Sequence, residues 1–222
     1  MWIVFARFIL FATLMVSAAW LSTGCQSMYY NTMEKFGYQK REILVDRVKE
    51  ARDEEQETAQ QFASALEKFS AVINFKGGEL EEKYEKLKAE FERCESRADA
   101  VKKRIAAVEN VGEALFEEWE AELKQYSNAN LRRTSRQKLV DTRRQYDRLI
   151  RSMKRAEAKI NPVLAVFRDQ VLFLKHNLNA RAIASIQNEL VSVETDVASL
   201  IREMEASISE ADGFIKTMTG SN

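Results

Sequence analysis

The residue types that most often do chemistry are scarce in this chain of 222 residues. It has one histidine, His176, and two cysteines, Cys25 and Cys94. A single histidine excludes a multi-histidine metal site, and two cysteines exclude a disulfide framework or a cysteine-rich zinc module. The sequence contains no GxxxxGK[ST], GxSxG or HExxH segment. These observations predict a protein that is not an enzyme and that holds no metal or cofactor.

Cys25 is the residue whose sequence context predicts a reaction. It ends the segment Leu21-Ser22-Thr23-Gly24-Cys25, which follows an uncharged apolar run over residues 8–21. This run of about 14 residues is too short to span a bilayer as a helix but has the length of a secretory signal. The segment is similar to a bacterial lipobox, in which small residues admit the lipoprotein peptidase and the thiol receives a diacylglyceryl group. We therefore predict lipidation of Cys25; the alternative is a plain signal peptide or an uncleaved anchor.

Lipidation would divide the chain into a signal peptide over residues 1–24, a lipid anchor with a short tether over 25–40, and a single domain over 41–218. The residue after the cysteine is Gln26, not the aspartate that resembles an inner-membrane retention signal. We therefore expect the outer membrane, periplasmic face, with the inner membrane as the alternative. Export removes nucleic acid from the expected partners, in agreement with 34 basic and 34 acidic residues and no net charge.

Helices must carry the rest of the chain, because it has only one proline and 7 glycines. Apolar residues recur in steps of three and four in stripes over 44–73, 80–126, 146–178 and 183–215. In the first stripe the polar residues Glu55 and Thr58 interrupt a pattern that we continue through Ala59 and Leu66. The sequence predicts an all-α fold, an elongated antiparallel (up-down) bundle of about four long helices with coiled-coil-type packing. Such stripes also suit coiled-coil dimers, so a homo-oligomer is possible.

Turn-forming residues separate the stripes. Gly77 and Gly78 predict the first turn, and the segment 127–130 (Ser-Asn-Ala-Asn) predicts the second. At residues 176–179 an asparagine could end one helix, although a continuous helix competes; the phase shift of the stripe favours a turn. Pro162 lies within an unbroken stripe and predicts a kinked but continuous helix. Gly112, in a stripe position, predicts a close helix approach or a slight bend.

Basic residues gather between 131 and 160, where eleven Lys or Arg face three acidic residues. One interpretation is a ridge for an anionic ligand, such as a lipid head group or peptidoglycan, that includes Arg143, Arg144, Arg148 and Arg151. The other is intramolecular, because a hairpin would set the acidic residues of 113–122 beside Arg132, Arg133 and Arg136. We favour the intramolecular interpretation. Cys94 lies in a stripe and is expected to be a buried thiol.

Three segments carry a resemblance to a known family. They are KREILVDRV (40–48), ALFEEWE (114–120) and the run from Phe167 to Ala182 that includes FRDQVL and LKHNLNARA. With them, residues 28–216 resemble domain-of-unknown-function family 2959, a group of proteobacterial proteins of which many have lipoprotein-type N-termini. The resemblance implies a helical, envelope-associated protein and brings no activity, ligand or catalytic residue.

Together these features predict a non-enzymatic cell-envelope lipoprotein whose periplasm-facing helices act as a scaffold or adaptor. The expected partners are the membrane, through the lipid anchor, and a protein of the envelope. The alternative is a binding module that takes an anionic ligand on the basic residues of 132–159.

Overall fold

The described part of the structure is helical almost throughout. The computed structural model describes residues 39–75, 77 and 79–220, and these ranges contain no β-strand. The elements are α3 (Lys40–Ile73), α4 (Leu80–Leu123), α5 (Ala129–His176), α6 (Ala180–Ile186), the 3₁₀ turn η1 (Gln187–Glu189) and α7 (Leu190–Thr219). Cys25 and the signal peptide expected over residues 1–24 lie outside the described residues.

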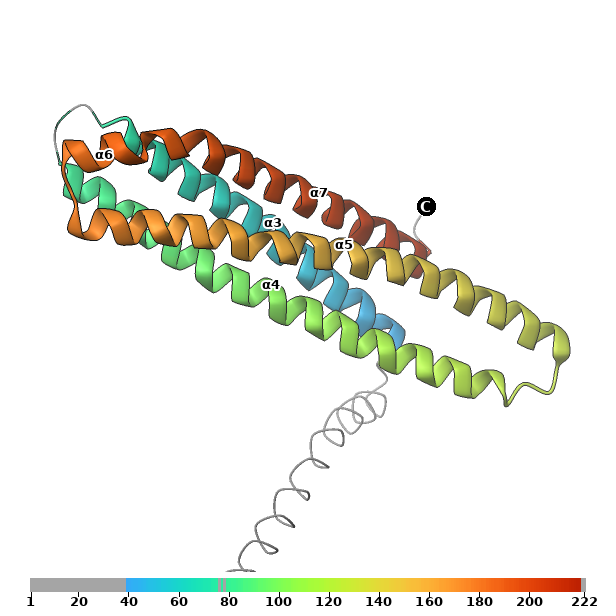
Figure 1. Cartoon of the computed structure of the whole chain (residues 1–222). Coiled ribbons are helices and arrows are strands. Elements are labelled where there is room, and N and C mark those ends of the chain that lie inside the picture. The colour runs from blue at the N-terminus through green and yellow to red at the C-terminus, as the bar shows by residue number, and fades with distance from the viewer. Residues whose placement is uncertain (1–38, 76, 78, 221–222) are drawn as a thin grey trace, which may run out of the picture. The chain divides into compact units, whose positions relative to one another are not determined.

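The chain divides into two compact units, Met1–Ile43 and Leu44–Asn222. In the second unit the four long helices run antiparallel, each returning alongside the one before it (Figure 1). The backbone of α5 packs closely against both α4 and α7. Ion pairs join α3 to the same neighbours, Arg97 to Glu54 on the α4 side and Arg52 to Asp212 on the α7 side. The predicted all-α bundle is confirmed.

The buried stripes of α3 and α7 differ from the predicted ones by one residue in places. On α3 the buried positions alternate in steps of four and three without a break: Leu44, Val48, Ala51, Glu55, Thr58, Phe62, Ala65, Phe69 and Val72. Glu55 and Thr58 therefore belong to the stripe that they were expected to interrupt, and Ala59 and Leu66 are only half-buried. On α7, Ser207 and Phe214 are buried, whereas their apolar neighbours Ile208 and Ile215 are half-buried.

The helix ends have local causes. The side chain of Asn128 caps α5 by accepting hydrogen bonds from the backbone N–H groups of Asn130 (2.9 Å) and Leu131 (3.2 Å). Asn179 caps α6 in the same way through Ala182 N–H (3.0 Å), so the turn favoured at 176–179 is confirmed. Asn177 ends α5 with its amide donating to Phe173 O, at a φ of −130°. Gly77, between α3 and α4, has the positive φ (117°) that glycine tolerates.

Pro162 and Gly112 both lie inside long helices, α5 and α4 respectively. α5 continues through Pro162, whose side chain is exposed on the outer face of the helix. Gly112 of α4 is buried, and a Cβ at this position would overlap the ring of Tyr146 on α5. The expectation of a close helix approach at Gly112 is therefore confirmed.

The hairpin formed by α4 and α5 is longer than the other two helices. α4 has 44 residues and α5 has 48, against 34 in α3 and 30 in α7. Near the end of α7, Phe214 contacts Tyr146 of α5, with ring centroids 6.3 Å apart. The first part of α5 therefore extends beyond α7, as Figure 1 shows for the yellow-green end of the hairpin. This end carries the first part of the basic stretch of residues 131–160.

Candidate functional site

The basic residues of α5 form an exposed ridge. All eleven Lys or Arg between 131 and 160 are exposed, and eight of them are arginines. Ten positions between 131 and 160 lie within about 60° of the direction opposite the buried stripe, since successive helix residues turn by 100°: 133, 136, 137, 140, 144, 147, 151, 154, 155 and 158. We call the exposed Lys and Arg side chains of residues 132–159 the basic ridge.

Five of these ten residues are arginines and one is a lysine; the other four are Gln137, Val140, Asp147 and Ala158. An arginine presents five N–H donors in a planar fork that matches the oxygens of a carboxylate or a phosphate, and it stays charged at all relevant pH values. A row of such side chains along one helix face, one or two turns apart, suits a surface or chain of anionic groups more than one small anion. This chemistry agrees with the anionic-ligand interpretation of the sequence.

Ion pairs within the bundle use only part of the ridge. Across helices, Lys154 pairs with Glu109 of α4 (2.9 Å), Arg155 with Glu203 of α7 (3.5 Å), and Arg143 with Glu120 of α4. Arg143 also lies over the Phe116 ring, 5.0 Å from its centroid. These contacts support the intramolecular interpretation for three residues of the ridge.

Of the four arginines singled out from the sequence, two have ion-pair partners among the described residues and two do not. Arg143 has the contacts just described, and Arg144 pairs within its own helix with Asp141 at 3.7 Å. Arg148 and Arg151 have no carboxylate oxygen within 4.0 Å among the described residues, and the same holds for Arg132, Arg133, Arg136, Lys138 and Lys159. The ridge thus keeps a set of exposed charges that the bundle does not neutralise by direct ion pairs.

Arg132, Arg133 and Arg136, which were expected beside the acidic residues of 113–122, form no ion pair with them among the described residues. Glu120 pairs with Arg143 and Glu95 with Arg168, so each step back along α4 matches one step forward along α5. Within the acidic segment, Glu120 reaches Arg143, whereas the indole N–H of the adjacent Trp119 donates to Ser135 Oγ at 2.9 Å. The hairpin therefore brings the first turns of α5 beside the acidic end of α4, while the ion pair of Glu120 forms with Arg143, further along α5.

Glu55 is the polar residue that sequence reasoning placed outside the core. Its side chain is buried at the centre of the stripe of α3, with Thr58 on the same helix and Ser207 on α7 also buried. Neither carboxyl oxygen has a hydrogen-bond partner of good geometry among the described residues. Burial raises the pKa of Glu55 from 4.5 to about 8, and the nearby Ser207 hydroxyl offsets this only in part. The unbroken alternation of four and three through position 55 is the signal that could have revealed its burial.

A raised pKa can mark a general acid or base, but the position of Glu55 argues for a structural role. Its side chain has no exposed surface in the bundle, so a substrate would have to separate the helices to reach it. Cys94 is enclosed in the bundle like Glu55, whereas His176 lies at the surface. Cys94 is buried as expected, and burial raises the pKa of its thiol to about 12, which suppresses the nucleophilic thiolate. His176 is the last residue of α5 and is exposed.

The described residues contain neither a metal-binding cluster nor a membrane-spanning helix. No group of three or more His, Cys, Asp or Glu side chains in this part of the chain could hold a metal ion. None of its helices combines the length and the apolar character needed to cross a bilayer. The predicted lipidation site, Cys25, falls outside the residues to which both statements apply.

The fold and the ridge define a class of protein: an antiparallel all-α bundle with a long, basic α4–α5 hairpin. Comparison with known families agrees with the resemblance found in the sequence. The family model described as Protein of unknown function (DUF2959) matches residues 29–218, so the chain belongs to this family. No curated protein and no solved structure matches the chain.

Proposed function

We propose that the protein is a non-enzymatic lipoprotein of the cell envelope, in which a helical bundle acts as a periplasm-facing scaffold or adaptor. The observation that carries the proposal is the segment Leu21-Ser22-Thr23-Gly24-Cys25 directly after an apolar run of signal-peptide length. Two or three acyl chains on Cys25 would hold the chain to a membrane far more firmly than one chain can, because each buried methylene contributes about 0.8 kcal/mol.

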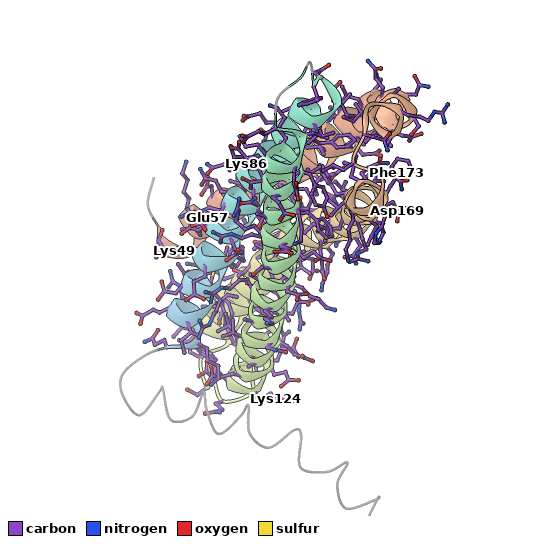
Figure 2. All side chains as sticks on the ribbon, turned by 90° about the vertical axis from the view of Figure 1, so that its left-hand side faces the viewer. Lys49, Glu57, Lys86, Lys124, Asp169 and Phe173 are labelled. Carbon is purple, nitrogen blue, oxygen red and sulfur yellow. The ribbon has the colours of Figure 1, made fainter. Side chains whose placement is uncertain are left out.

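The bundle supports a scaffold role in two ways. Its long helices present many charged side chains to solvent, including Lys49, Glu57, Lys86 and Asp169 (Figure 2). Its reactive groups, Cys94 and Glu55, are enclosed in the core. A surface of this kind offers docking area to a protein partner.

The N-terminus of the mature protein tests this proposal. We expect intact mass spectrometry of the chain purified from outer-membrane fractions to give a mass that begins at Cys25 and carries acyl groups. A Cys25→Ser variant should lose the acyl mass and remain unprocessed by the lipoprotein peptidase. An unacylated wild-type chain, or one recovered from the cytoplasm, would contradict the proposal.

A second candidate function is the binding of an anionic ligand on the basic ridge. The specific observation that favours it is the set of ridge arginines without ion pairs, above all Arg148 and Arg151. Because these charges form no direct ion pair with a described residue, their exposure on a helix face agrees with a role in binding. The ligand would be a lipid head group or an anionic polymer such as peptidoglycan.

Charge reversal separates this function from a structural role of the ridge. We expect the Arg148→Glu/Arg151→Glu variant to keep its helical circular dichroism and its melting temperature, because neither arginine stabilises the fold through an ion pair. Its binding to anionic vesicles or to isolated sacculi should fall at least about 25-fold, since each basic residue near an anionic surface contributes roughly 1 kcal/mol.

Arg143→Glu is the matched control on the same helix. It removes the pair with Glu120 and the contact with the Phe116 ring, and it should lower the free energy of unfolding by about 1 kcal/mol. If the double variant unfolds, or if it binds as tightly as the wild type, the ridge is not a ligand site.

A further inference from the structure

The end of the α4–α5 hairpin combines two kinds of exposed residue. Between residues 123 and 140 there are five basic residues and no acidic one: Lys124, Arg132, Arg133, Arg136 and Lys138. Large apolar side chains are exposed in the same stretch, with Leu131 58%, Val140 43% and Tyr126 37% accessible. We call residues 123–140 the hairpin end. Exposed apolar side chains among cations are typical of a surface that meets the boundary between water and lipid.

The topology places the hairpin end at the same end of the bundle as the beginning of α3. Glu50 of α3, six residues after Leu44, pairs with Arg104 of α4 at 2.6 Å. From Arg104 to Leu123 α4 rises about 28 Å, whereas α3 covers only about 9 Å between Glu50 and Leu44. The hairpin end therefore lies about 20 Å beyond Leu44 along the bundle. Figure 2 shows Lys124 at this end and Lys86 toward the other.

Chain connectivity links this end to the predicted anchor. Cys25 precedes Lys40, the first residue of α3, by 15 residues. A chain of this length spans at most about 50 Å when fully extended. A lipid on Cys25 would thus hold the beginning of α3 within reach of the membrane, and a hairpin end that projects about 20 Å further along the bundle axis can contact the same bilayer.

We infer that the hairpin end docks on the anionic phospholipid head groups of the membrane that holds the lipid anchor. The inference rests on the proposed lipoprotein function and names the partner of the outermost part of the basic ridge. Arginine forks would bind the phosphates, while Leu131 and Tyr126 would enter the interface between head groups and acyl chains. A polymer of anionic sugars would account for the charges but would give the exposed apolar residues no environment.

A fluorescent probe on the anchored, full-length lipoprotein tests the inference. The Ser127→Cys variant places a thiol in the connection at the hairpin end, and the Asn74→Cys variant places a matched thiol in the exposed connection at the opposite end. Cys94 should not react with the dye, because it is buried and its thiol pKa is raised. Each labelled protein is reconstituted in vesicles of phosphatidylethanolamine alone or with phosphatidylglycerol.

With phosphatidylglycerol we expect a blue-shifted emission and protection from iodide for the probe at position 127, and neither change for the probe at 74. Reversal of Arg132, Arg133 and Arg136 to Glu should weaken docking by on the order of 100-fold, because each basic residue contributes roughly fivefold near an anionic surface. Reversal of Lys83, Lys86 and Lys88, at the opposite end, should have no effect. In phosphatidylethanolamine alone the probe at 127 should stay exposed to water.

The outcomes distinguish this inference from the function on which it rests. If the mass confirms acyl groups but the probe at 127 stays exposed to iodide with phosphatidylglycerol, the docking is refuted and the lipoprotein proposal stands. A spectral shift with soluble peptidoglycan fragments but not with anionic vesicles refutes lipid docking in favour of a polymer. A chain without acyl groups refutes the lipoprotein proposal and the inference with it.

Discussion

Replacing Glu55 with leucine is expected to stabilise the bundle, and the gain should grow as the pH rises. The side chain fills a core position of α3, and neither of its carboxyl oxygens has a well-formed hydrogen bond among the described residues. A buried charged group without a partner costs free energy, whereas an apolar side chain of similar volume suits this environment. At pH 8 and above, we expect the free energy of unfolding of Glu55→Leu to exceed that of the wild type by about 4 kcal/mol.

The pH dependence follows from the raised pKa of Glu55, which changes from 4.5 to about 8 in the folded protein. Between these values the folded state holds a proton that the unfolded state releases, so stability falls as the pH rises through this window. Below about pH 4.5 the carboxyl is protonated in both states and no stability is lost. Chemical denaturation of the wild type at pH 5, 7 and 9 should therefore show a loss of up to about 4 kcal/mol.

Glu55→Gln isolates the effect of ionisation, because it keeps the shape of the side chain and removes the titration. Its free energy of unfolding should lack the decrease that the wild type shows between pH 5 and pH 9. Glu67→Gln serves as the surface control, since the Glu67 side chain is 73% exposed; its stability should stay within about 0.5 kcal/mol of the wild type. If Glu55→Gln loses stability with pH in parallel with the wild type, the carboxyl does not titrate in this way.

Two glycines in helices should respond to alanine with opposite signs. Alanine at Gly112 would place a Cβ against the Tyr146 ring. That ring cannot move aside freely, because it packs edge-on against Phe116 (5.2 Å between centroids) and tilts against Phe214, while its hydroxyl donates to Glu109 O at 3.3 Å. Overpacking of this kind costs about 1–3 kcal/mol. We expect Gly112→Ala to lower the free energy of unfolding by about 1–2 kcal/mol after the gain in helix propensity.

Gly213 of α7 provides the matched control, because it is exposed and a Cβ there would meet no atom within 4 Å. Gly213→Ala should stabilise the bundle by about 0.5–1 kcal/mol. In a Tyr146→Val background the Gly112→Ala change should cost much less, as a double-mutant cycle of melting curves would show. Equal effects of Gly112→Ala with and without Tyr146 would mean that the ring is not the obstacle.

The helical architecture could be predicted because it depends on short-range patterns. The stripes of α4 and α5, from Leu87 to Leu115 and from Leu149 to Leu174, consist of apolar residues in steps of three and four, and most of their members are buried as predicted. The connection at 176–179 was likewise indicated by the phase shift of the stripe. Asn179 confirms it by capping α6. Such features need only neighbours within one or two turns of the chain.

The candidate site was predicted only in part. The sequence showed an excess of basic residues between 131 and 160, but it could not show which of them have partners. That depends on the register of the α4–α5 hairpin, which places Glu120 beside Arg143 and leaves Arg148 and Arg151 without ion pairs among the described residues. A shift of one helical turn in this register would have paired a different set of arginines.

The sequence by itself determined the helices, their approximate ends and the faces that they bury, because hydrophobic periodicity and capping residues act locally. Only the tertiary structure decided that Glu55 and Ser207 lie in the core, in place of Ala59 and Ile208 beside the stripes. Adjacent positions near a helix seam differ little in periodicity, and the packing of four helices together selects between them. The same packing encloses a carboxyl without a well-formed hydrogen bond, and leaves the basic end of the hairpin exposed.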